Sequence, residues 1–231
     1  MNTQGLLDQL LKSASGALSG NSSTNTSQGS AGGSQLGSLL SGAGGGALAA
    51  GAVGLLLGNK KARKMGGKAV KYGGMAALGV VAFKAWQQWQ KNSANAPQGQ
   101  PQTVDRLPAP QQEQHSHAIL RALIGAAKAD GHIDDREREL IDAEVAKLTN
   151  DPQTLQWFDA ELRKPLDPAE VASAAQTPEM AAEMYLASLL VVDEQSFMEK
   201  AYLQELSSQL KLDPQLIAEL EEIAARGGPK G

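Results

Sequence analysis

A carboxylate-rich turn is the part of this sequence best suited to chemistry. Asp130, Asp134 and Glu137 fall within eight residues, and Asp193, in a later turn, is expected to converge on them. Oxygen ligands at this density suit a hard divalent cation such as calcium or magnesium. The competing interpretation is that Asp134 and Glu137 form a capping box at a helix start while the other carboxylates face water. Because the order of these residues differs from a calcium-loop signature, capping is the favoured interpretation.

The rest of the sequence carries no recognisable catalytic constellation. His115 and His117 are two residues apart and so do not share a helical face, which argues against a joint metal site. The sequence has no Gly-x-Ser-x-Gly elbow, no phosphate-binding Gly-Lys-Ser/Thr loop and no His-Glu-x-x-His motif. With no cysteine, thiolate sites and disulfides are excluded. We therefore expect a protein that is not an enzyme and has no resident cofactor, the divalent cation aside.

Charge divides the chain into two opposite halves. Residues 1–111 hold ten Lys/Arg and two acids, whereas residues 112–231 hold eleven Lys/Arg and twenty-three acids. Such asymmetry predicts a segment that binds an anionic surface, joined to a separate module. Apolar flanks, and the presence of only Tyr72 for base stacking, favour lipid headgroups over nucleic acid. The cations expected to contact headgroups are Lys60, Lys61, Arg63, Lys64, Lys68 and Lys71.

Small residues recur at helical spacing on both sides of this basic stretch. In a helix they would form a stripe where a second backbone approaches closely, a glycine zipper suited to self-association in lipid. The stripe consists of Gly42, Gly46, Ala50, Gly54 and Gly58, and Gly73 repeats the spacing in the second apolar run. Trp86 and Trp89 follow that run like an interfacial belt.

Four arrangements of this region remain open. The apolar runs 42–58 and 72–83 are both shorter than the roughly 30 Å hydrocarbon core requires. The choices are one marginal transmembrane helix near 70–90, two short paired helices, a helix pair lying in the interface, or a flexible Gly/Ala linker. Glycines at helix spacing suit close packing better than a helix in water. We therefore favour membrane association.

The acidic half predicts a compact all-α module. Asp151, Asp167, Thr177 and Asp213 each precede a proline, which combines a capping side chain with a first-turn proline. The run Tyr185–Val192 is apolar all round and predicts a central buried helix. The expected helices cover residues 113–130, 135–148, 152–163, 168–175, 178–192, 197–210 and 214–226.

Four segments follow from these patterns. Residues 1–41 are expected to be disordered, with a marginal amphipathic helix at 5–18. Residues 42–91 are the Gly/Ala-rich basic membrane-associated hairpin or single span. Residues 92–112 read as a Pro/Gln linker that lets the acidic domain move independently. Residues 113–231 are the acidic helical domain.

The string Ala-Asp-Gly-His-Ile-Asp-Asp-Arg-Glu, residues 129–137, carries a family resemblance. It resembles the motif of TerB-like domains, the helical module of tellurite-resistance proteins, with Ile133 expected to enter the core across the turn. The whole chain resembles the YebE-type bacterial inner-membrane proteins, a family without an assigned activity. A second turn, Val191–Leu203, is a degraded counterpart of the first.

This resemblance implies a bacterial inner-membrane setting. The leading hypothesis is a non-enzymatic, membrane-associated interaction protein whose acidic domain recruits a protein partner, in an envelope or tellurite-type metal stress response. The alternative is a soluble divalent-cation-binding protein with a Gly-rich linker.

Overall fold

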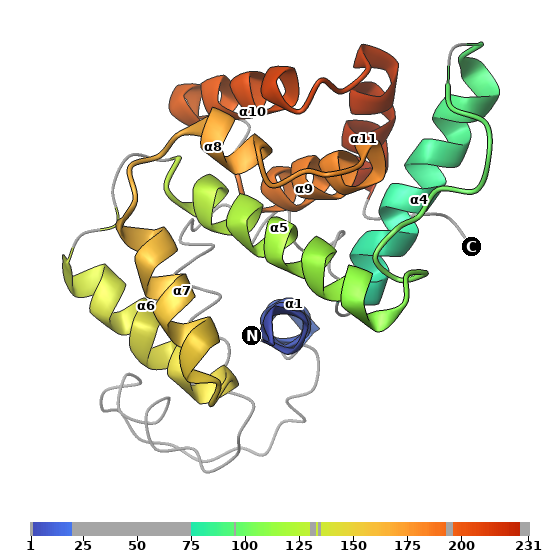
Figure 1. The fold of residues 1–231 in the computed structure, drawn as a ribbon. Helices are drawn as coiled ribbons and strands as arrows, with labels where there is room; N and C mark the ends of the chain where they lie inside the picture. Colours follow the sequence, from blue (N-terminus) through green and yellow to red (C-terminus); the bar gives the residue numbers. More distant parts are fainter. Residues whose placement is uncertain are drawn as a thin grey trace, which may run out of the picture.

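A computed structural model of the chain describes residues 2–19, 75–94, 96–129, 133, 135–192 and 196–226, and within these ranges the chain is all-α (Figure 1). The described helices are α1 (Thr3–Ser19), α4 (Met75–Asn92), α5 (Ala109–Ala127), α6 (Asp135–Leu148), α7 (Pro152–Arg163), α8 (Pro168–Ala172), α9 (Pro178–Val191), α10 (Phe197–Gln209) and α11 (Pro214–Arg226).

Two helices form the centre of this fold. α5 packs along α9, whose residues from Met180 to Leu189 are all buried, which confirms the predicted central helix. α4 and α11 pack together at one end of the pair, and α6 and α7 lie side by side at the other (Figure 1). α1 lies against α5 and also contacts α4 and α6.

Side-chain caps set the helix starts as the sequence predicts. Asp167 accepts the Ala169 N–H at 2.9 Å, and Asp213 accepts the Gln215 N–H at 2.8 Å. Asp151 and Thr177 cap α7 and α9 in the same way. Each cap satisfies a backbone donor that the first helical turn leaves without a partner. Ile133 packs against the core before α6 begins, as expected from the motif.

The predicted transmembrane helix near residues 70–90 and the predicted interfacial belt of Trp86 and Trp89 are wrong. Trp86 and Trp89 are only 2% and 6% exposed, and their rings meet edge to face at 5.0 Å in the core that α4 shares with α9 and α11. No helix in the described ranges combines the length and the apolar character needed to cross a bilayer. This finding overturns the predicted transmembrane helix and the inner-membrane localisation. The apolar face of α4 is satisfied by protein instead of lipid.

The connection between α4 and α5 also differs from the expected Pro/Gln linker. Val104 is fully buried, and Thr103 and Ala96 are nearly so. Arg106 lies over the Phe83 ring of α4, 3.8 Å from its centroid. A β-carbon on Gly79 would come within 2.4 Å of the Asp105 carboxylate, so glycine permits this approach. Apolar residues scattered among prolines and glutamines therefore fasten this connection to α4.

Gly125 offers a test of the packing between α5 and α10. A β-carbon there would lie 2.6 Å from the Tyr202 hydroxyl and 3.0 Å from Val171 Cγ2. Overpacking of this kind costs about 1–3 kcal/mol, against about 1 kcal/mol gained from alanine's helix propensity. We expect Gly125→Ala to lower the free energy of unfolding in urea denaturation, and to lower it less in a Tyr202→Phe background. An equal loss in both backgrounds would show that the hydroxyl is not the obstacle.

Candidate functional site

The amphipathic helix α1 lies in a groove formed by helices distant from it in the sequence. Leu6 and Leu7 are fully buried and Leu10 is 5% exposed. Their spacing places all three on one face of the helix, which meets α5 and reaches α4 and α6. The sequence predicts a marginal helix at 5–18, and burial of this face accounts for its formation.

Glu113 of α5 caps the N-terminus of α1. Its Oε1 accepts hydrogen bonds from the Thr3 N–H and the Thr3 hydroxyl, both at 2.6 Å, and its Oε2 accepts the Gln4 N–H at 3.1 Å. The Gln4 side chain also donates to Gln112 Oε1 at 2.9 Å. A carboxylate is well placed here because helix N-termini carry unpaired N–H groups and partial positive charge. α5 thus recognises the end of α1 as well as its apolar face.

A second carboxylate secures the residue before α1. The Asn2 N–H donates to Asp151 Oδ2 at 2.8 Å and to Thr154 Oγ1 at 2.9 Å. Asp151 also caps α7, and the Thr154 hydroxyl donates to it at 2.6 Å. Hydrogen bonds from Thr154, Gln153 and Asn2 hold the pKa of Asp151 below its usual value, with Thr154 the largest cause. One side chain therefore serves the starts of both α7 and α1.

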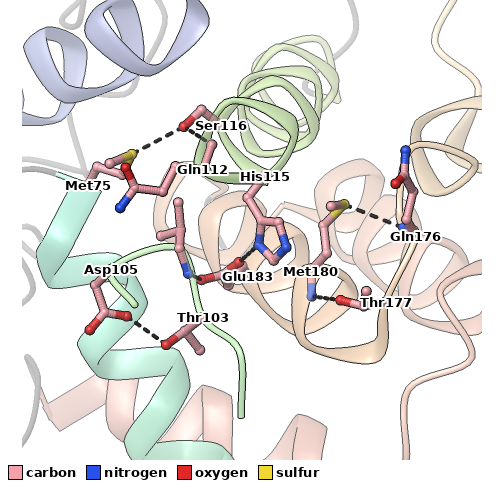
Figure 2. Close-up of polar contacts among 11 residues, drawn as sticks. Met75, Thr103, Asp105, Gln112, His115, Ser116, Gln176, Thr177, Met180 and Glu183 are labelled. Carbon is pink, nitrogen blue, oxygen red and sulfur yellow. Dashed lines mark hydrogen bonds and ion pairs between the residues drawn. The ribbon is translucent and has the colours of Figure 1, made fainter. Parts of the chain in front are cut away.

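A buried polar network links α5, α9 and the α4–α5 connection. His115 Nδ1 of α5 and Glu183 Oε2 of α9 lie 2.6 Å apart, and Glu183 Oε1 accepts the Val104 N–H at 2.6 Å (Figure 2). The two side chains are 5% and 0% exposed. Burial raises the pKa of Glu183, against the lowering effect of His115. The pair therefore joins α5, α9 and the α4–α5 connection in the interior of the fold.

The two neighbouring histidines have different roles. His117 stacks on Trp157, with ring centroids 4.3 Å apart, and burial lowers its pKa. Ser116, between the histidines, donates to the Gln112 carbonyl at 2.7 Å and lies 3.2 Å from Met75 Sδ (Figure 2). The prediction that His115 and His117 do not share a helical face is therefore confirmed.

A charged surface concavity lies between α5, α7 and α8. Arg121 and Lys164 both pair with Glu161, at 2.9 and 3.0 Å, and Lys164 also pairs with Glu170 at 2.7 Å. Lys128 donates to the carbonyls of Glu161 and Lys164. Burial lowers the pKa of Lys128. These ion pairs and hydrogen bonds join the end of α7 to α5 and α8.

Comparison with known proteins gives the family. Residues 42–224 match the family described as "Protein of unknown function (DUF533)". The chain belongs to the DUF533 family. An "Uncharacterized protein in ampR 5'region" of Yersinia enterocolitica is 34% identical over 100 residues, covering 43% of this chain and 72% of that protein. No solved structure matches.

The DUF533 match includes the residues that hold α1 but does not include α1 itself. Glu113, Asp151 and Thr154 lie inside the matched residues, as do His115 and Glu183. α1 lies wholly before the first matched residue. The family module therefore supplies the receiving surface, and the helix that fills it comes from outside the module.

Most residues singled out from sequence lie outside the described residues. Glu137 falls in α6, but nothing is described of its side chain, and the described residues contain no group of acids and histidines able to hold a metal. Those outside the described ranges are Asp130, Asp134, Asp193, Gly42, Gly46, Ala50, Gly54, Gly58, Gly73, Lys60, Lys61, Arg63, Lys64, Lys68 and Lys71.

Sequence reasoning did not single out Glu113, Asp151 as an α1 partner, or Glu183. Glu113 and Glu183 interact across separations of 110 and 68 residues, so no local spacing marks them. The usable signal was the position of Glu183, an acid beyond the first turn of its helix and two residues before the apolar run Tyr185–Val192.

Proposed function

We propose that this chain is a non-enzymatic protein-interaction module that receives an amphipathic helix in the groove now filled by α1. The observation that carries the proposal is the capture of α1, through three buried leucines and the Glu113 cap, by helices far from it in the sequence. Helix-in-groove recognition reads an apolar face in this way.

The leucine face offsets only part of the cost of forming α1. Burying Leu6, Leu7 and Leu10 contributes about 1.5–3 kcal/mol for each side chain. Ordering the backbone costs about 1–2 kcal/mol for each residue, and α1 has 17. The helix therefore also depends on its own hydrogen bonds and on the Glu113 cap. A helix whose docking offsets so little of its ordering cost is one that a competing helix can replace.

The TerB-like resemblance of residues 129–137 supports a helical module of this type and forms part of the proposal. Through tellurite-resistance proteins and the YebE-type proteins, it associates the module with metal or envelope stress, where the acidic domain would recruit a partner. The partner expected from the groove is an amphipathic helix with a leucine face and an N-terminus open to capping by Glu113.

A peptide-binding measurement tests this function. In the full chain, Leu6→Asp with Leu7→Asp should release α1, because two buried leucines become charged. A fluorescent peptide of residues 2–19 should then bind this variant more tightly than it binds the wild type, measured by anisotropy. A peptide with the same two aspartates is the matched control.

The milder Leu10→Asp change guards against misfolding of the double variant, since Leu10 retains some exposure. Circular dichroism and thermal melts identify which variants stay folded. A folded variant that fails to bind the wild-type peptide, or that binds both peptides equally, would contradict the proposal.

A further inference from the structure

We propose that α1 exchanges between two copies of this chain, so that the helix of one copy fills the groove of the other. The inference rests on the proposed helix-binding function and names the partner as a second copy. It uses no surface beyond the groove already described.

The contacts that hold α1 do not depend on chain continuity. The hydrogen bonds that hold the N-terminus of α1 join residues more than 100 positions apart, from Asn2 to Asp151 and Thr154 and from Thr3 to Glu113. The leucine contacts likewise meet helices far along the chain. The groove would therefore bind an identical helix from another molecule through identical contacts.

Chain length permits the exchange. Residues 20–74 join α1 to α4. A chain of that length spans up to about 180 Å when fully extended. This reach far exceeds the roughly 30 Å diameter of a small domain. Connection length therefore does not confine α1 to its own groove.

Exchange preserves the energy of docking. A swapped pair contains the same buried leucines and the same Glu113 caps as two separate chains, so no new interface has to be stabilised. What is lost is the freedom of two independent molecules. The swapped form should therefore increase with protein concentration.

The absence of cysteine makes a direct trapping experiment possible. Gln4 and Gln112 face each other across the groove, with their side chains 2.9 Å apart. One copy would carry Gln4→Cys, and a second copy with a size tag would carry Gln112→Cys. After mixing, a short thiol-specific cross-linker should trap a covalent heterodimer, resolved by denaturing gel.

Two controls are needed. One measures cross-linking that arises from random collisions between chains, and the other tests whether α1 docks in the groove at all. Lys12→Cys lies on the same helix with its side chain 64% exposed, so its mixture with Gln112→Cys should give several-fold less heterodimer. A single chain with both Gln4→Cys and Gln112→Cys should cross-link internally. Internal cross-linking with mixed heterodimer no higher than the Lys12→Cys level would overturn exchange alone. Absence of internal cross-linking would overturn the docking on which both proposals rest.

Discussion

Replacing Glu183 by alanine should destabilise the folded chain by about 3–5 kcal/mol, the usual cost of removing one partner from a buried pair. The change leaves the Val104 N–H and His115 without the oxygens they now contact at 2.6 Å. Each buried polar group left unsatisfied costs about 1–3 kcal/mol. Urea denaturation measures the loss.

Glu183→Gln is the matched control for this result. Its amide keeps an oxygen for the Val104 N–H and an N–H for His115 Nδ1, so both contacts can persist. We expect it to retain most of the stability that alanine loses. Equal losses in the two variants would show that carboxylate charge, and not hydrogen bonding, supports the network.

Comparing the wild type with Glu183→Gln also tests how stability depends on pH. Burial raises the folded pKa of Glu183 above its usual value of 4.5. Between 4.5 and that raised pKa, the unfolded chain has lost the proton and the folded chain retains it, so stability falls as pH rises. Glutamine does not titrate, so the stability of the wild type relative to Glu183→Gln should decline as pH rises above 4.5. His115 and Asp105 lie close enough to the wild-type Glu183 carboxyl to affect its pKa, and both residues are unchanged in Glu183→Gln. A relative stability that rises over this interval would contradict the assigned direction.

Helix positions were predictable from the sequence because caps act locally. Asp151-Pro152, Asp167-Pro168 and Thr177-Pro178 each join a side-chain acceptor to a proline that needs no backbone partner, and the observed helices begin at those prolines. The acidic half could therefore be divided into helices with starts and most ends close to those observed. The interacting residues are only two or three positions apart, so no tertiary knowledge was required.

The groove and the buried network were not predictable in the same way. Glu113 looks like any acid in the first turns of α5, and only the folded chain brings it to the Thr3 N–H. Glu183 and His115 meet because α5 and α9 cross at the centre of the fold. A pairing across 68 residues leaves no periodicity to detect.

The environment of α4 was predicted wrongly from the apolar run 72–83. Within the helix, Ala82 and Ala85 are buried and Gly79 lies close to Asp105, so small residues here permit close packing inside the protein. Close packing of small residues is typical of helices in lipid, but it serves equally well inside a protein. The sequence of this helix cannot distinguish the two environments. The packing of α11 against α4 places this helix in a protein environment, and no local sequence pattern predicts that contact.

Trp86 provides the experiment that separates the two environments. We expect Trp86→Ala to lower the free energy of unfolding by about 3–5 kcal/mol in buffer free of lipid and detergent, because it removes a 2% exposed ring from the core and its edge-to-face contact with Trp89. Val80→Ala, on the same helix at a side chain 37% exposed, should change it by only about 0.5 kcal/mol. If α4 lay in a lipid interface, Trp86 would have little to stabilise in buffer and the two variants would unfold alike. If only Trp86→Ala lowers the free energy of unfolding, α4 belongs to the protein core. Similar urea midpoints for the two variants would contradict that assignment.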